Sequence, residues 1–116
     1  MVTRERQGLV ITPVADLLDE MTGRRLQAAV RGYVQRGELV QAVDLRHLTY
    51  IDSPTLAALI RVLRAVREVG GSIGLIVDQP NILKVLSITG LDRIFPVYRD
   101  ESEAQADAEA SRLVPA

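Results

Sequence analysis

Short apolar runs of strand length alternate in this chain with longer segments whose apolar residues recur at helical spacing. The runs are 9–11, 39–45, 72–77 and 94–98. A further segment, 3–6, lies just before the first run. It is predicted to form a short edge strand that pairs with this run through a turn at Gly8. Strands that alternate with helical segments indicate an α/β layer in which helices connect the central strands. We therefore expect a mixed sheet of about five strands.

The first two helical segments lie on either side of the run 39–45. The first is predicted to begin at a cap, Asp19 or Thr22, and to end at Gly37, and the second to end at Gly70-Gly71. Their apolar stripes are Leu26, Ala29, Val30, Tyr33 and Val34 in the first, and Leu56, Leu59, Ile60, Leu63 and Val66 in the second. Each stripe is a single helical face, which predicts packing against the sheet.

Two further helices are expected in the second half of the chain, which makes about four in all. Pro80 opens a shorter helix that stops at Gly90, with Ile82, Val85 and Leu86 facing inward. Pro96 lies within the last apolar run and confines that run to a sheet edge. The acidic, Ala-rich segment 101–112 predicts a loosely held terminal helix.

Composition excludes several classes of protein. The chain has 116 residues, 47% hydrophobic and 25% charged, which predicts one soluble globular domain over 1–116. No apolar run approaches the ~20 residues of a membrane span, and no secretory signal is evident, so we expect a cytoplasmic protein with no membrane partner. Cysteine is absent, which excludes disulfides and thiolate chemistry. A net charge of −1 and few aromatics argue against direct nucleic-acid binding.

The junction Asp52-Ser53-Pro54 carries the strongest functional signal. It follows a polar loop after the run 39–45 and has the composition of a helix start, with Ser53 as the predicted N-cap and Pro54 as the first helical residue. The Ser53 hydroxyl would then accept a hydrogen bond from the amide of Thr55 or Leu56. A serine at the positive end of a helix dipole, beside a carboxylate, is either a plain cap or a switch.

Enzymatic and metal-binding interpretations have less support. His47 is the only histidine, and with Asp44 and Asp52 it does not form a tight metal-ligand pattern. A hydrolase that used His47 as the base for Ser53 would lack a nucleophile elbow and an orienting acid. A phosphoaspartate receiver with Asp44 or Asp52 as acceptor lacks the usual acidic pair, and Lys84 lies within a helical segment. We expect no enzyme activity, cofactor or metal.

Arginines recur at helical spacing in the second helical segment, at Arg61, Arg64 and Arg67. A solvated helix face explains this row most simply. The alternative is a contact surface for an acidic partner.

Three blocks of the sequence resemble the STAS domain of bacterial anti-sigma factor antagonists. The strongest is 43–59, which contains an Asp-Leu strand end followed by apolar-Asp-Ser at a helix start. The second is 86–98, and a third, weaker block is 18–26. The blocks occur in the family's order, and the resemblance covers nearly the whole chain. The resemblance implies a STAS-like α/β fold with a mixed sheet.

The resemblance also implies a mechanism. In that family the serine after the motif Asp, here Ser53, is phosphorylated by the partner anti-sigma factor, a serine kinase of the histidine-kinase-like ATPase fold. The unphosphorylated antagonist binds this kinase and frees a sigma factor, and phosphorylation ends the binding. The implied partner-binding residues are Asp19, Thr22, Asp52, Ser53, Pro54 and Thr55.

The chain departs from the family pattern at three positions. Pro54 replaces the usual Ser or Thr, Thr55 replaces the usual Gly, and Leu17 replaces an acidic residue. These departures leave open an alternative in which the domain is a scaffold or ligand-sensing module without a phosphoswitch.

Overall fold

A computed structural model describes residues 4–6, 8–14 and 20–113 of the chain. Five strands in this part form one sheet in the order β1-β2-β3-β4-β5. They are β1 (Arg4–Arg6), β2 (Leu9–Pro13), β3 (Val40–Asp44), β4 (Ser72–Ile76) and β5 (Val97–Tyr98). Strands β2 to β5 are parallel, and β1 pairs antiparallel with β2. The predicted mixed sheet and both edge strands are confirmed.

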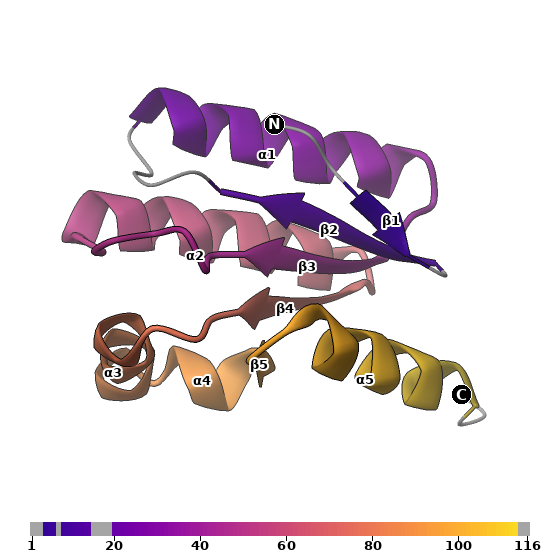
Figure 1. Cartoon of the computed structure of the whole chain (residues 1–116). Coiled ribbons are helices and arrows are strands. Elements are labelled where there is room, and N and C mark those ends of the chain that lie inside the picture. The colour runs from indigo at the N-terminus through magenta and orange to yellow at the C-terminus, as the bar shows by residue number, and fades with distance from the viewer. Residues whose placement is uncertain (1–3, 7, 15–19, 114–116) are drawn as a thin grey trace.

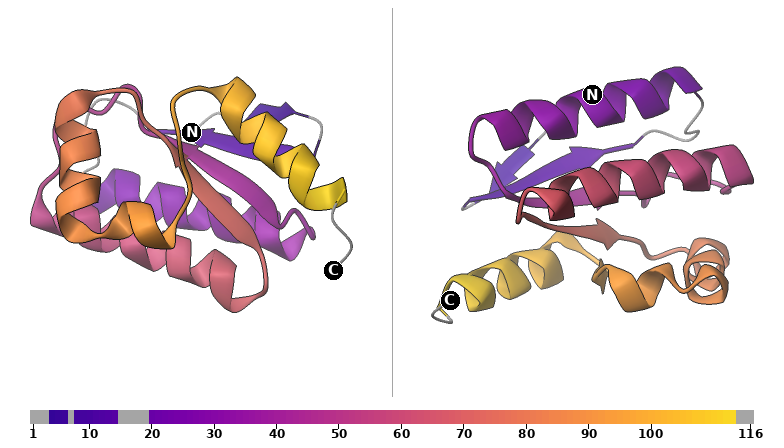
Figure 2. Two further views of the ribbon diagram at one scale, coloured as in Figure 1. Left: turned by 90° about the horizontal axis from the view of Figure 1, so that it is seen from below. Right: turned by 180° about the vertical axis from the view of Figure 1, so that it is seen from behind.

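Helices cover both faces of this sheet (Figures 1 and 2). Those described are α1 (Glu20–Gln35), α2 (Ser53–Glu68), α3 (Pro80–Thr89), α4 (Leu91–Ile94) and α5 (Glu101–Leu113). Helices α1 to α4 share one hydrophobic core with one face, whereas α5 packs on the opposite face. The prediction of about four helices is close to the five described, since the additional helix, α4, is a single turn.

The larger core lies between the sheet and the stripes of α1 and α2. Leu26 and Val30 of α1 and Leu59 and Leu63 of α2 are buried there, as their spacing predicts. Val62, which lies outside the predicted stripe, is buried as well. The core therefore covers a wider face of α2 than the sequence pattern indicates.

The smaller core fixes α5 to the sheet. Ala104 and Ala108 are buried against β-strand side chains, which include Ile11 and Ile76. Small residues let the helix approach the sheet closely, and the Tyr98 hydroxyl donates a hydrogen bond to Asp107. The terminal helix is thus packed, and the prediction that it is loosely held is wrong.

Two boundaries differ from those predicted. Ile94 ends α4 instead of opening a strand, so β5 has two residues. Thr22 lies inside α1 and is not its cap, whereas Asp19, the alternative cap, falls outside the described residues. None of the described helices is long and apolar enough to cross a membrane.

Candidate functional site

The junction between β3 and α2 lies at the carboxyl edge of the parallel strands. Strand β3 ends at Asp44, a loop over 45–52 follows, and α2 begins at Ser53. Helix α1 begins at the same end of the molecule (Figure 1). A Cβ on Gly23 of α1 would lie 3.4 Å from the Cβ of Ala58, so the first turn of α1 packs closely against the second turn of α2. The loop therefore opens onto a surface formed by two helix N-termini.

Asp52, not Ser53, caps α2. The Asp52 backbone is extended, its Oδ1 accepts a hydrogen bond from the Thr55 N–H at 2.9 Å, and its carbonyl oxygen accepts one from the Leu56 N–H at 2.9 Å. The predicted N-cap at Ser53 is wrong by one residue, because the carboxylate of Asp52 takes the amide that the hydroxyl was expected to bind. Pro54 is consequently the second helical residue, where its missing N–H leaves no helical bond unmade.

Ser53 is left with an exposed hydroxyl. Within the part of the chain that the structure describes, its side chain makes no hydrogen bond. Asp52 and Pro54 on either side are exposed too, and Tyr50 is 52% exposed. The hydroxyl is therefore accessible, next to a carboxylate and close in sequence to an exposed aromatic ring.

Thr55 supports the cap from inside the domain. It is only 5% exposed, so its side chain points away from the surface that Asp52, Ser53 and Pro54 present. Hydrogen bonds from Thr55, the side chain first and the backbone N–H second, hold the pKa of Asp52 below its ordinary value. The Asp52 carboxylate thus stays ionised beside Ser53. The branched side chain of Thr55 is buried in the domain.

The loop before α2 is held by the segment that opens α3. The Gln79 side-chain amide donates to the carbonyl oxygens of Leu45 at 2.7 Å and Leu48 at 2.6 Å. Asn81 donates to the Thr49 carbonyl oxygen at 2.9 Å. Both donors come from more than thirty positions further along the chain. Sequence reasoning missed them, because the only local signal was two amide residues flanking Pro80.

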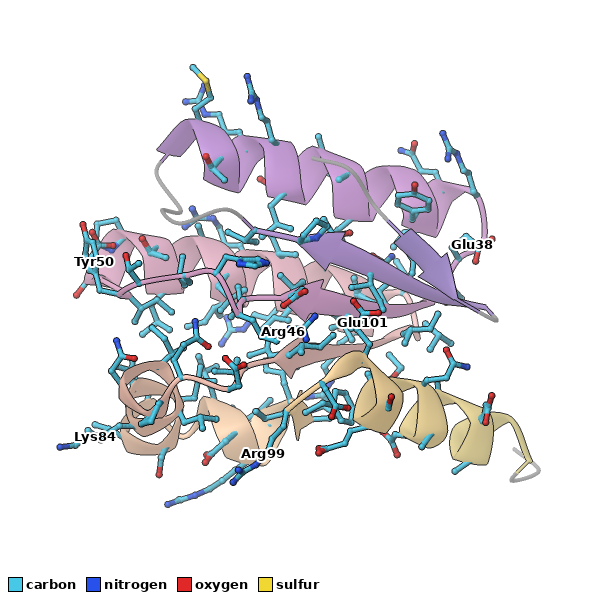
Figure 3. All side chains as sticks on the ribbon, viewed as in Figure 1. Glu38, Arg46, Tyr50, Lys84, Arg99 and Glu101 are labelled. Atoms are coloured by element: carbon cyan, nitrogen blue, oxygen red, sulfur yellow. The ribbon has the colours of Figure 1, made fainter. Side chains whose placement is uncertain are left out.

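Asp44 and Arg46 form a partly buried ion pair behind the loop. Asp44 is 1% exposed and accepts from Nε of Arg46 at 3.0 Å and from Nη2 at 2.9 Å. Arg46 also points toward Glu101 at the start of α5, with its Nη2 3.3 Å from the carboxylate (Figure 3). The hydrogen bonds with Asp44 raise the pKa of the guanidinium above its ordinary value. Asp44 is therefore a structural anchor.

The other residues that the sequence suggested for catalysis or metal binding do not form a common site. His47 and Lys84 are exposed, and Figure 3 shows Lys84 projecting outward from α3. Among the residues described, no group of three or more His, Asp or Glu side chains could hold a metal ion. Asp44 is engaged by Arg46, so a shared acidic site with His47 and Asp52 has no support.

The STAS domain family profile matches residues 1–104, and the chain belongs to the STAS domain family. BtrV of Bordetella bronchiseptica, named as a candidate anti-sigma factor antagonist, is 29% identical over 99 residues, 85% of each chain. The anti-sigma F factor antagonist of Paenibacillus polymyxa is 24% identical over 104 residues, 89% of each chain. The relatives are thus regulators, in agreement with the expectation that the chain is not an enzyme.

Solved structures share the fold along most of their length. An anti-sigma factor antagonist from Mycobacterium paratuberculosis superposes with a TM-score of 0.78 at 22% identity, covering 91% of this chain and 90% of that one. The phosphorylated form of the Bacillus cell fate determinant SpoIIAA gives a TM-score of 0.71 at 18% identity, covering 92% and 97%. The predicted STAS-like α/β fold is confirmed.

Proposed function

We propose that this chain is an anti-sigma factor antagonist whose binding to its anti-sigma factor is switched off by phosphorylation of Ser53. The observation that carries the proposal is the exposed hydroxyl of Ser53, which is released from capping because Asp52 caps α2. A serine that held the cap would have to break that hydrogen bond before it reacted. Ser53 is instead available to a kinase without any change in the fold.

The partner in this proposal is a serine kinase of the histidine-kinase-like ATPase fold. Relatives of this chain are named as antagonists of anti-sigma factors, and one solved relative is a phosphorylated form. The docking surface comprises Asp52, Ser53 and Pro54, with the backbone of Thr55 beneath them. Thr22 in the first turn of α1 extends it, and Asp19, the other residue that the family resemblance implies, lies outside the described residues. Because sigma factors and their regulators act in the cytoplasm, the proposal places the chain there.

The charge at the start of α2 explains how phosphorylation would act. A phosphoserine carries close to two negative charges at neutral pH. At Ser53 they would adjoin the Asp52 carboxylate, which is ionised and already occupies the first-turn amide of Thr55. The phosphate would therefore remain at the surface and would alter the contact with the partner through its charge and its size. The loop would keep its position, because Gln79 binds it.

Pro54 favours a second candidate function, a STAS scaffold or ligand-sensing module with no phosphoswitch. Its exposed ring lies directly after the acceptor, where the family motif has Ser or Thr. The ring fixes the backbone there and removes one N–H that a partner could bind. Under this alternative, negative charge at Ser53 leaves partner binding unchanged.

Phosphotransfer and binding assays separate the two functions. The anti-sigma kinase encoded in the same genome is incubated with the chain and γ-labelled ATP, and binding is measured by titration calorimetry. We expect label on the wild type, none on Ser53→Ala, and binding that Ser53→Ala retains and Ser53→Asp loses.

Ser87→Ala is the matched control, since Ser87 is another exposed serine, on α3. It should be labelled as the wild type is. Label that persists in Ser53→Ala, or equal binding by the Ala and Asp variants, contradicts the phosphoswitch. Equal binding without label supports the scaffold.

A further inference from the structure

A groove lies between the second half of α2 and the segment that runs from the end of α3 through α4. Its volume is about 510 Å³, which is within the range of small-molecule sites. Figure 2 shows α2 and α4 on the same side of the sheet. Its lining residues are Ile60, Arg64, Arg67, Glu68, Thr89, Leu91, Ile94 and Phe95.

Four of the eight residues that line the groove are apolar. Leu91 and Phe95 are 4% and 3% exposed and belong to the main core, so they are rigid parts of the domain. Ile94 is 54% exposed although it is a large aliphatic residue. Ile60 of α2 lies across from these residues, packed against the core. The groove thus offers an apolar surface that is open to solvent.

Two arginines of α2 line the same groove. The Arg67 guanidinium lies 5.5 Å from the centroid of the Phe95 ring and 3.4 Å from the Ile94 carbonyl oxygen. These contacts hold it at the groove and use one of its five N–H donors. Arg64, one turn earlier, is exposed and makes no ion pair among the described residues. The groove therefore has one cationic side chain held in place, Arg67, and a second exposed one, Arg64, beside an apolar wall.

The charge in the groove favours an anion. Arg64 and Arg67 provide two positive charges, and Glu68 provides one negative charge. Guanidinium groups bind carboxylates through two parallel hydrogen bonds, a geometry that both arginines are free to offer. An apolar wall with a net positive charge matches a molecule that is itself half apolar and half anionic.

We propose that this groove binds a small amphipathic acid, a molecule with an apolar chain or ring and one carboxylate group. The apolar body lies against Ile60, Ile94 and Phe95, and the carboxylate pairs with Arg64 and Arg67. The site is separate from Ser53, because Arg67 lies fourteen residues further along α2, about 21 Å along the helix axis. Its occupation and the proposed phosphoswitch are thus independent and can fail independently.

The test uses decanoate as the probe, with decanol as a neutral molecule of the same chain length. Binding to the full chain is measured by titration calorimetry and located by amide chemical-shift changes. We expect decanoate to bind with shifts in α4 and the second half of α2, and decanol to bind at least tenfold more weakly. Equal binding of the two, or shifts confined to other helices, overturns the proposal.

Matched variants on α2 test the charged contacts. Arg64→Gln and Arg67→Gln should each weaken decanoate binding by roughly tenfold. Arg61→Gln is the control, because Arg61 is exposed on the same helix but does not line the groove. Glu68→Gln should tighten binding, since it removes the one negative charge. A loss with Arg61→Gln as large as with Arg64→Gln would show nonspecific attraction and refute the site.

Discussion

The side-chain amide of Gln79 lies 2.6 Å from the carbonyl oxygen of Leu48 and binds the loop that leads to α2. The same amide donates to the Leu45 carbonyl oxygen, so one residue from the start of α3 holds both ends of the first loop turn. This contact sets the position from which Asp52 and Ser53 are presented.

Gln79→Ala should lower the free energy of unfolding by about 1 to 3 kcal/mol, because the Leu48 carbonyl oxygen loses this donor and the Leu45 carbonyl oxygen keeps only the Leu48 N–H. Urea unfolding measures the change, and hydrogen exchange of the loop amides should accelerate. Asn81→Ala is the control, since it removes a single exposed hydrogen bond to Thr49. An equal loss in both variants would show that the loop is not held chiefly by Gln79.

The cap assignment predicts opposite outcomes for two neighbouring residues. Asp52→Ala should destabilise the domain, because the Thr55 N–H loses its acceptor. Ser53→Ala should change the free energy of unfolding by no more than about 0.5 kcal/mol, as for an exposed residue without a specific contact. Thermal unfolding of both variants checks the prediction. A larger loss of unfolding free energy for Ser53→Ala would show that Ser53 caps α2.

Asp52 should also make stability depend on acid. Its pKa in the folded protein lies below the ordinary 3.8, so its contribution is present above that pH and is lost as the pH falls through the folded pKa. The free energy of unfolding should fall more steeply below pH 4 in the wild type than in Asp52→Asn. Thr55→Val, which removes the side-chain donor, should raise the Asp52 pKa in a carboxyl NMR titration; an unchanged value would refute the role of the Thr55 side chain.

The ion pair of Asp44 and Arg46 should be costly to break. Arg46→Met leaves the Asp44 carboxylate buried without its cationic donors. We expect a loss of about 2 to 3 kcal/mol, below the value for a fully buried pair because 27% of the Arg46 side chain is exposed. Glu101→Gln removes only the outer contact and should cost about 0.5 kcal/mol in urea unfolding. Similar losses in the two variants would contradict this ranking.

Two glycines should respond to alanine with opposite sign. A Cβ on Gly74 would lie 2.6 Å from the Tyr98 ring and 3.0 Å from the Pro96 carbonyl oxygen, so Gly74→Ala should cost about 1 to 3 kcal/mol. Gly32, within α1, has open space around the added Cβ. Gly32→Ala should stabilise the domain by about 0.5 to 1 kcal/mol, because alanine favours the helix. Calorimetric melting of both variants measures the difference.

Local patterns in the sequence specified most of the architecture. The apolar runs became the strands, and the stripes that include Leu26 and Leu59 became the buried faces of α1 and α2. Periodicity determines these features because each depends on residues a few positions apart. The motif around Ser53 likewise placed the start of α2 within one residue and indicated the candidate acceptor.

Only the tertiary structure decided how that acceptor is presented and what surrounds it. Asp52 and Ser53 are both good caps, and in the folded chain it is the Asp52 carboxylate that accepts the Thr55 N–H. The sequence favoured a solvated helix face for the row of arginines. In the folded chain, Phe95 at the end of α4 lies beside Arg67 of that row. Contacts between residues far apart in the chain leave no periodic signal in the sequence. The site and the groove consist of such contacts, so only the tertiary structure defines them.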